Sequence, residues 1–172
     1  YDGIVIAVSR ELYDAGVTSL TKEEVKGIYA GEISNWEELG GPDEEILAIG
    51  REQGSGTRDT FNEEIMCDKS AETPGVGTTA GSNAEIKPAL TGSEQAIGYL
   101  GYSYVKDDSI GAITLDGVMP TEETIKDGSY ELARKLYFYT YDEATAGAQA
   151  FIDFMLGSKG QEIAAEYGFI PL

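Results

Sequence analysis

Seven consecutive residues combine the groups that proteins use to bind small anions. The stretch 51–57 reads Arg-Glu-Gln-Gly-Ser-Gly-Thr. Its glycines let backbone N–H groups approach an oxyanion without a Cβ in the way, while its hydroxyls and its guanidinium add side-chain donors. Because a strand is predicted before it and a helix after it, the amides and the helix dipole point into one small space. We therefore predict an anion site at Arg51, Ser55, Gly56 and Thr57.

Other chemistries for the same stretch lack a required residue. A nucleotide-binding phosphate loop needs a lysine before its hydroxyl residue, and Gly56 occupies that position. Ser55 as a nucleophile finds no base, because the chain has no histidine and no Ser-x-x-Lys pattern begins there. We interpret Arg58 as a solvated partner of Asp59 or Glu63 rather than as a ligand. The remaining alternative is a flexible loop that ends in a threonine helix cap.

The overall charge restricts how any anion could bind. The 172 residues include 12 lysines and arginines against 31 aspartates and glutamates, which gives a formal charge of -19. Such a field repels nucleic acid and anionic lipid, so we expect no nucleic-acid partner. It also opposes small anions, and a site must therefore rest on short-range hydrogen bonds and local dipoles. The longest apolar run, at 4–8, is far shorter than the roughly 18 residues of a membrane span.

Cysteine and carboxylate usage argues against catalytic and metal chemistry. With one cysteine and no histidine, most hydrolase triads and thiolate metal sites are excluded. We predict that Cys67 lies in a helix beside Met66 as a buried structural thiol. The paired acidic residues are interpreted as solvated helix starts or turns, and we expect no metal and no cofactor. These pairs are Glu23-Glu24, Glu44-Glu45 and Glu122-Glu123.

The elements that position the stretch 51–57 follow from hydrophobic periodicity. Strands are predicted at 4–8, 46–49, 96–100, 112–115 and 136–140, the last rich in aromatic residues. Helices are predicted at 21–30, 57–67, from 82 onward, at 120–126, at 144–156 and at 158–168. Helices alternate with strands, so we expect an α/β fold with a largely parallel sheet.

Several helix boundaries carry explicit signals. Thr21 begins a capping box that Gly31 closes at the other end of its helix. Ser82 begins a second capping box, although Pro88 falls inside the following helix and is expected to shorten or kink it. Ser158 is predicted to cap the last helix.

Several segments in order resemble one family, the extracytoplasmic phosphate-binding proteins of ABC-type phosphate importers. The matching segments are 2–8 (Asp-Gly-Ile-Val-Ile-Ala-Val), 20–36, 51–61, 96–102 and 151–172. The resemblance implies a type II periplasmic-binding-protein-like fold, in which phosphate lies between two lobes joined by crossing strands. It also implies that Arg51, Ser55, Gly56 and Thr57 contact phosphate from the second lobe.

The resemblance divides the chain into three parts. Residues 1–16 would be a hinge-adjacent strand of an incomplete lobe I, and 17–132 would form lobe II with the anion-binding loop. Residues 133–172 would supply the returning hinge strand, expected at 136–140, and the C-terminal helices of lobe I.

Two departures from the family matter. Relatives usually have another lobe's worth of sequence before the Asp-Gly strand, with a serine or threonine loop and an aspartate that accepts the proton of bound phosphate. Some relatives also place an orienting aspartate two residues after the arginine, where this chain has Gln53, with Glu52 adjacent. The chain starts at Tyr1 without a signal peptide, so we expect a processed product or an excised segment. Uncovered hinge strands and C-terminal helices would otherwise favour association with another copy.

The leading hypothesis is a binding module for inorganic phosphate. We expect it to be located outside the cytoplasm, either in the periplasm or anchored at the cell surface. The expected partners are the membrane subunits of an ABC importer. An alternative is a phosphate-sensing or surface interaction domain that keeps the fold without transport. An enzyme acting on phosphate esters would need a base and a metal cluster that the sequence does not offer, and we expect no catalytic residues.

Overall fold

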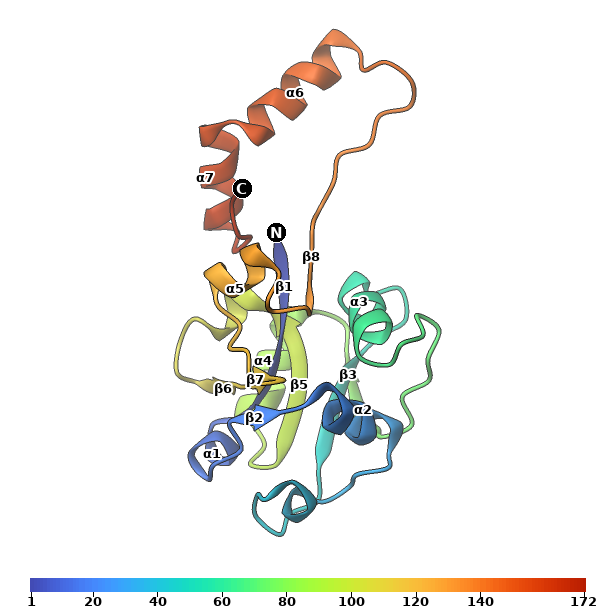
Figure 1. The fold of residues 1–172 in the computed structure, drawn as a ribbon, viewed down its shortest axis with the longest axis vertical. Coiled ribbons are helices and arrows are strands. Elements are labelled where there is room, and N and C mark those ends of the chain that lie inside the picture. The colour runs from blue at the N-terminus through green and yellow to red at the C-terminus, as the bar shows by residue number, and fades with distance from the viewer.

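The computed structural model describes residues 1–172 as a sheet covered by helices, from which a C-terminal segment projects (Figure 1). The strands are β1 (Asp2–Ser9), β2 (Ser19–Leu20), β3 (Leu47–Arg51), β4 (Val76–Ala80), β5 (Ala96–Gly101), β6 (Ile110–Ala112), β7 (Thr114–Leu115) and β8 (Ala133–Arg134). The α-helices are α1 (Arg10–Asp14), α2 (Lys22–Ala30), α3 (Gly56–Glu64), α4 (Asn83–Thr91), α5 (Glu122–Asp127), α6 (Ala146–Leu156) and α7 (Ser158–Glu166). Short 3-10 helices cover Trp36–Leu39 and Tyr102–Val105.

The main sheet is mixed, so the prediction of a largely parallel sheet is wrong. Its order is β4-β3-β5-β1-β6, and β8 pairs with the other end of β1. β3 runs parallel to β4 and β5, because α3 and α4 provide the crossovers that parallel strands need. No such crossover leads into β1, which lies antiparallel to β5, β6 and β8.

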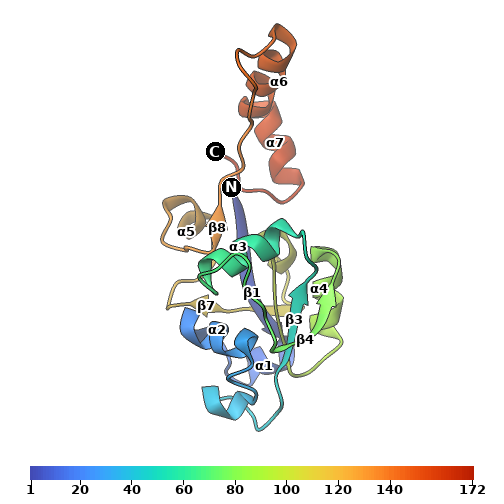
Figure 2. The same cartoon turned by 90° about the vertical axis from the view of Figure 1, so that its right-hand side faces the viewer.

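The core lies on both faces of β1, the central strand. Residues 4–8 are fully buried, as the continuous apolar run predicts. Ile4, Ile6 and Val8 pack into the larger cluster with α2 and α3, while Ala7 faces the smaller cluster under α4. Figure 2 shows α2 and α4 on opposite sides of the sheet strands.

The strand predicted at 112–115 is two strands that change partners. β6 pairs with β1, whereas β7 pairs in parallel with β2. The switch falls at Ile113, whose N–H donates to the Ile6 carbonyl at 3.1 Å, and Thr114 then donates to Thr18 at 3.0 Å.

The predicted helix caps are partly confirmed. Thr21 forms the predicted capping box, and Gly31 ends α2 with a φ of 75°. Ser82 is the N-cap of α4 as predicted, but the capping box predicted there does not form, and the cap predicted at Ser158 is wrong. The Ser82 hydroxyl donates to the Glu85 carboxylate at 3.1 Å and accepts no helix N–H, and Gly157 is the N-cap of α7. Pro88 does not end α4, which continues to Thr91.

The prediction of a helical, buried Cys67 is wrong. α3 ends at Glu64, and Cys67 is exposed with a φ of 59°. Phe61 and Ile65 do face the core as predicted. Cys67 follows the end of α3 and is therefore not on the helix face that packs into the core.

The C-terminal segment differs most from expectation. The strand predicted at 136–140 is absent, and 135–145 have no regular secondary structure. Residues with high strand propensity form a strand only where a neighbouring strand can pair with them. The pairing of β8 with β1 ends at Arg134, opposite Asp2, so the residues after Arg134 have no partner strand. The segment 135–145 instead runs out to α6, and α7 returns the chain to the N-terminus, where the amino group of Tyr1 donates to the Ile170 carbonyl at 2.6 Å.

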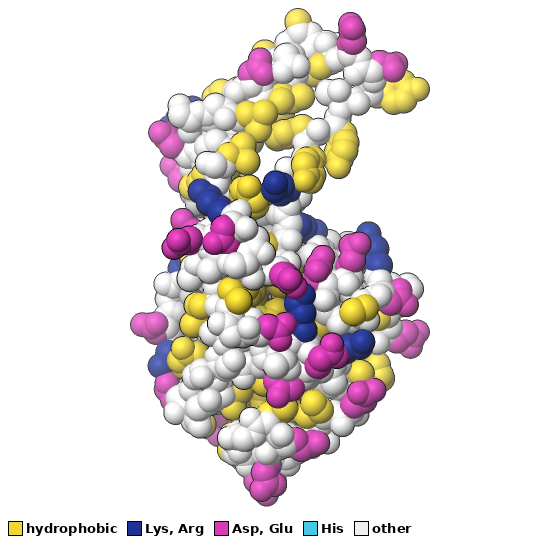
Figure 3. Space-filling model, viewed as in Figure 1, with side chains coloured by type: hydrophobic (Ala, Val, Ile, Leu, Met, Phe, Trp, Pro, Cys, Tyr) yellow, Lys and Arg dark blue, Asp and Glu magenta, His cyan; other side chains and the backbone are white.

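The expectation that this region is uncovered is confirmed. Tyr139 and Tyr141 are 88% and 95% exposed, and large apolar side chains of α6 are about half exposed. Figure 3 shows hydrophobic side chains gathered around the opening between 135–145 and the two helices. None of the helices combines the length and apolar character that spanning a bilayer requires.

Candidate anion-binding site

The stretch 51–57 has the predicted strand–loop–helix arrangement. β3 ends at Arg51, and α3 begins at Gly56. Gly54 has a φ of 83°, a left-handed backbone conformation that residues other than glycine adopt only at an energetic cost. Ser55 is the N-cap of α3, and its Oγ accepts a hydrogen bond from the N–H of Arg58 at 3.3 Å. The hydroxyl proton of Ser55 is left to donate to a ligand.

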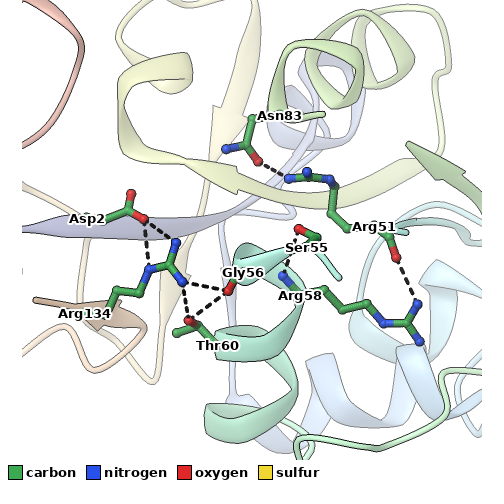
Figure 4. Close-up of polar contacts among 8 residues, drawn as sticks. All are labelled: Asp2, Arg51, Ser55, Gly56, Arg58, Thr60, Asn83 and Arg134. Carbon is green, nitrogen blue, oxygen red and sulfur yellow. Dashed lines mark hydrogen bonds and ion pairs between the residues drawn. The ribbon is translucent and has the colours of Figure 1, made fainter. Parts of the chain in front are cut away.

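Arg51 is buried and held entirely by neutral acceptors. Its side chain donates from Nη1 to Oδ1 of Asn83 at 2.5 Å (Figure 4). It also donates from Nε to the Ala80 carbonyl at 3.2 Å and from Nη2 to the Gly81 carbonyl at 3.1 Å. The residue is only 8% exposed. A guanidinium carries five N–H donors, so these bonds fix its orientation and still leave donors for a ligand. Because none of the three acceptors is a carboxylate, its positive charge is not neutralised by them.

These three hydrogen bonds hold Arg51 in place, although Gln53 stands where some relatives have an aspartate that orients the arginine. The partners come from the end of β4 and the start of α4, and neither Glu52 nor Gln53 is among them. Asn83 is a site residue that the sequence reasoning missed. The available signal was a polar side chain at the first position of a predicted helix, which can face the same space as the start of α3.

A buried aromatic cluster supports the loop from below. Phe61 of α3 stacks on Tyr99 of β5 with centroids 4.0 Å apart and planes at 7°, and Tyr29 packs against both rings. The Tyr99 hydroxyl accepts the N–H of Arg51 at 3.1 Å. Burial raises the pKa of Tyr99 and raises that of Tyr29 further, so both phenols stay neutral. The cluster therefore fixes β3 and α3 relative to each other without adding negative charge near the loop.

Arg58 does not have the partners predicted for it. Its Nη1 donates to the carbonyl of Arg51 at 3.1 Å, while Asp59 pairs with Lys69 at 3.5 Å. The guanidinium thus braces the end of β3 from the first turn of α3. It stands beside the loop as a second cation.

A third arginine, which the sequence reasoning also missed, reaches the loop from β8. Arg134 donates to the Gly56 carbonyl at 2.8 Å and to Oγ1 of Thr60 at 3.3 Å, both from Nη1. Its Nε and Nη2 donate to one carboxylate oxygen of Asp2 at 3.1 and 2.9 Å. No local pattern marks Arg134 in the sequence, because its partners lie far from it along the chain.

A cavity of about 300 Å³ opens in front of these residues. Thr57, the second residue of α3, and Asn83, the first of α4, both line it, so two helix N-termini face one space. Its other lining residues are Asp2, Gly101, Ser103, Tyr104, Arg134, Leu136, Tyr167, Gly168 and Phe169. Of the four predicted site residues, Thr57 lines the cavity. Arg51 and Gly56 are not lining residues but are each hydrogen bonded to one, Arg51 to Asn83 and Gly56 to Arg134. Ser55 precedes Gly56 at the cap of α3.

The geometry provides several hydrogen-bond donors for an anion. No group of three or more histidine, cysteine, aspartate or glutamate side chains is arranged to hold a metal ion. The site instead combines a charged buried guanidinium, helix N-termini and hydroxyl groups around a small cavity.

Comparison with known proteins places this chain in a family. A family model described as a PBP superfamily domain matches residues 1–159, and the chain therefore belongs to the PBP superfamily. Within that superfamily its relatives include the phosphate-binding protein PstS of Bacillus subtilis, which is 38% identical over 160 residues. That match covers 92% of this chain and 52% of the relative. PstS of Staphylococcus saprophyticus is 37% identical, and the match covers 99% of this chain and 55% of that protein. The chain thus spans about half the length of these relatives.

Solved structures agree with the assignment of the fold. A phosphate ABC transporter substrate-binding protein of Clostridium perfringens, determined with bound phosphate, superimposes with a TM-score of 0.83 at 39% identity. An ABC-type phosphate transport receptor of Vibrio cholerae gives a TM-score of 0.82 at 29% identity. Both matches cover 99% of this chain, and they cover 69% and 70% of the other chains. The type II periplasmic-binding-protein-like fold is therefore confirmed.

Proposed function

We propose that this chain supplies one wall of the phosphate-binding cleft of an ABC-type import component. The observation that carries the proposal is the guanidinium of Arg51, buried, held by three neutral acceptors and placed behind the start of α3. Such a group attracts an oxyanion at short range despite the formal charge of -19 on the chain. Support also comes from relatives named as phosphate-binding proteins.

The proposed ligand contacts are the Arg51 guanidinium, the Ser55 hydroxyl, the backbone amides of Gly56 and Thr57, and the Thr57 hydroxyl. All of these groups donate hydrogen bonds, so they favour a multiply charged tetrahedral oxyanion and do not by themselves separate phosphate from sulfate. Because they act from one side of the ligand, we expect weak binding, with a Kd of about 1 mM. No bond of the ligand is broken, and no cofactor is involved.

Binding is best tested by two-dimensional NMR, which detects millimolar affinities. Titration of the ¹⁵N-labelled chain with sodium phosphate should shift the amide signals of Gly56 and Thr57, and Arg51→Met should abolish those shifts. Arg10→Met is a matched control, because Arg10 pairs with Asp14 and lies over the ring of Tyr13, both neighbours within or next to its own short helix. Titration with sodium chloride at equal ionic strength separates specific binding from screening. Phosphate shifts that persist in Arg51→Met would contradict the proposed site.

The division into lobes is part of the same proposal. We infer that residues 17–132 form the lobe that carries the loop, and that 1–16 and 133–172 belong to the other lobe. Support comes from the pairing of Asp2 with Arg134, which brings the two connecting strands together at the edge of the compact body (Figure 1). Limited proteolysis should cut first within the exposed segment 135–145 and leave the rest of the compact body intact.

We also propose an extracytoplasmic location, with the membrane subunits of an ABC importer as the receiving partner. The family relationship supports this part of the proposal. The test is transport: in cells that lack their own phosphate-binding component, the gene that encodes this chain should restore uptake of ³²P-phosphate, and an Arg51→Met version should not.

The apolar C-terminal surface is the basis for proposed self-association. It surrounds a groove of about 760 Å³ between 135–144 and the helices α6 and α7. Exposed apolar surface of this extent favours contact with another copy. The charge of -19 opposes that contact, so association should strengthen with salt. Sedimentation at 0.05 and 0.5 M NaCl tests this, and a monomer at both salt concentrations and high protein concentration would contradict it.

A further inference from the structure

Gly56 and Thr57 share one peptide unit, and the two ends of that unit face different partners. The carbonyl belongs to Gly56, and the N–H belongs to Thr57. Since a peptide is planar and trans, its C=O and N–H point in opposite directions. In the first turn of a helix the N–H points out of the N-terminus, and here this is the end of α3 proposed to receive an anion. Whatever holds the carbonyl of Gly56 therefore orients the N–H of Thr57.

The group that holds this carbonyl from outside the helix is Arg134. Its Nη1 lies 2.8 Å from the Gly56 oxygen and 3.3 Å from Oγ1 of Thr60, which also donates to the same oxygen at 3.1 Å. A Cβ added to Gly56 would lie 2.9 Å from Nη1 of Arg134, so the guanidinium packs directly against the glycine. A charged donor that binds the carbonyl polarises the peptide unit. The hydrogen bond that the N–H of the same unit donates becomes stronger as a result.

The remaining donors of Arg134 show that it is poorly placed to act as a direct ligand. Nε and Nη2 both donate to Asp2, whose carboxylate balances the charge, and Nη1 contacts Gly56 and Thr60. Four of the hydrogen bonds of the guanidinium thus end within the protein. Arg51 differs, because its acceptors are neutral and its charge is not balanced by them.

We propose that Arg134 is a positioning residue of the anion site, which orients the Thr57 N–H by binding the Gly56 carbonyl and is itself fixed by Asp2. Because Asp2 and Arg134 are opposite each other in the β1–β8 pair, the same guanidinium ties the two strands that lead out of the compact body to the first peptide of α3. This inference rests on the proposed phosphate function and adds residues from outside the loop to it.

Arg134→Lys distinguishes a positioning role from a direct electrostatic one. A lysine keeps the charge and loses the fork, so undiminished phosphate binding indicates attraction by charge, whereas weakened binding indicates positioning. Asp2→Asn loosens Arg134 and also removes a carboxylate from the cavity lining, so its effect is read on the Thr57 amide and not on affinity. We expect Arg134→Met to weaken phosphate binding about tenfold, which corresponds to one charge-assisted hydrogen bond. Arg134→Lys should not restore affinity, because a single ammonium cannot replace the fork that spans Asp2 and Gly56.

The Thr57 amide signal provides a readout that does not require phosphate. In phosphate-free spectra, both Arg134→Met and Asp2→Asn should move the Thr57 amide proton, and Arg10→Met should leave it in place. Undiminished phosphate binding by Arg134→Lys, or an unmoved Thr57 amide in Arg134→Met, would overturn the inference. If the unsubstituted chain binds no phosphate, the proposed function fails, and the Thr57 amide still decides whether Arg134 orients this peptide.

Discussion

Asn83 offers a test in which stability and anion affinity should respond differently to two substitutions. Its Oδ1 accepts Nη1 of Arg51 at 2.5 Å, and its side chain lines the cavity of about 300 Å³. Asn83→Ala leaves a donor of a buried guanidinium without its acceptor. A hydrogen bond to a charged group is worth about 2 kcal/mol, so we expect that loss in the free energy of unfolding. For a chain of this length, the melting temperature should fall by about 6 °C.

Asn83→Asp keeps the shape and replaces a neutral acceptor with a charged one. The new carboxylate pairs with Arg51 and lies at the N-terminus of α4, so the folded state should gain about 1 kcal/mol. The guanidinium lowers the pKa of the new carboxyl in the folded state. The gain is therefore complete above the ordinary aspartate range and is lost as the pH falls through the lowered pKa.

Anion affinity should fall in this same variant. An anion at the centre of the cavity lies about 4 Å from its lining, where two like charges repel by about 4 kcal/mol at an effective dielectric constant of about 20. Screening through the open side of the cavity reduces this to about 2 kcal/mol, which weakens phosphate binding roughly thirtyfold.

The assays are urea denaturation for stability and NMR titration for affinity, each on Asn83→Ala and Asn83→Asp. The Asn83→Ala chain should be less stable and should bind phosphate more weakly. The Asn83→Asp chain should be more stable but should also bind phosphate more weakly. Undiminished phosphate binding by Asn83→Asp would refute the placement of the anion in this cavity. Undiminished stability of Asn83→Ala would refute the role of Asn83 in holding Arg51.

Three further outcomes follow from the packing. Phe61→Ala should cost about 4 kcal/mol in urea denaturation, because it removes the ring that stacks on Tyr99, while the exposed Tyr139→Ala should cost almost nothing. Burial raises the pKa of Tyr130, whose hydroxyl donates to Ile4, so stability should decline as the pH rises above the ordinary tyrosine value of about 10, and less steeply in Tyr130→Phe. Cys67 should react with a thiol reagent in the native chain as fast as in urea, and protection of the thiol would contradict its exposure.

Features set by near neighbours in the chain could be predicted from the sequence. The capping box of Thr21 joins residues three apart, and the glycine stop of α2 is a property of one position. The strand–loop–helix arrangement of 51–57 could be predicted because its glycines, its hydroxyls and its flanking elements are contiguous. The buried run 4–8 was equally plain, because continuous apolar residues have no exposed side in a strand.

Features that depend on distant partners could not be predicted in the same way. The acceptors of Arg51 lie about thirty residues along the chain, and Arg134 lies 78 residues from Gly56. The strand predicted at 136–140 has strand composition but no neighbour to pair with. Whether a composition forms a strand depends on what stands beside it, and only the three-dimensional structure shows this.

The dispersed support of Arg51 matters for protein engineering. A designer who transplanted only residues 51–57 into another strand–loop–helix scaffold would carry over the glycines, the hydroxyls and the guanidinium. The carbonyls of Ala80 and Gly81 and the amide of Asn83 would stay behind, and so would the Tyr99 hydroxyl that accepts the Arg51 N–H. An unsupported arginine turns toward solvent or toward the nearest carboxylate. The smallest portable unit that holds Arg51 is therefore the set of three strands β3, β4 and β5 with α3 and α4, and β1 and β8 must be added to carry Asp2 and Arg134.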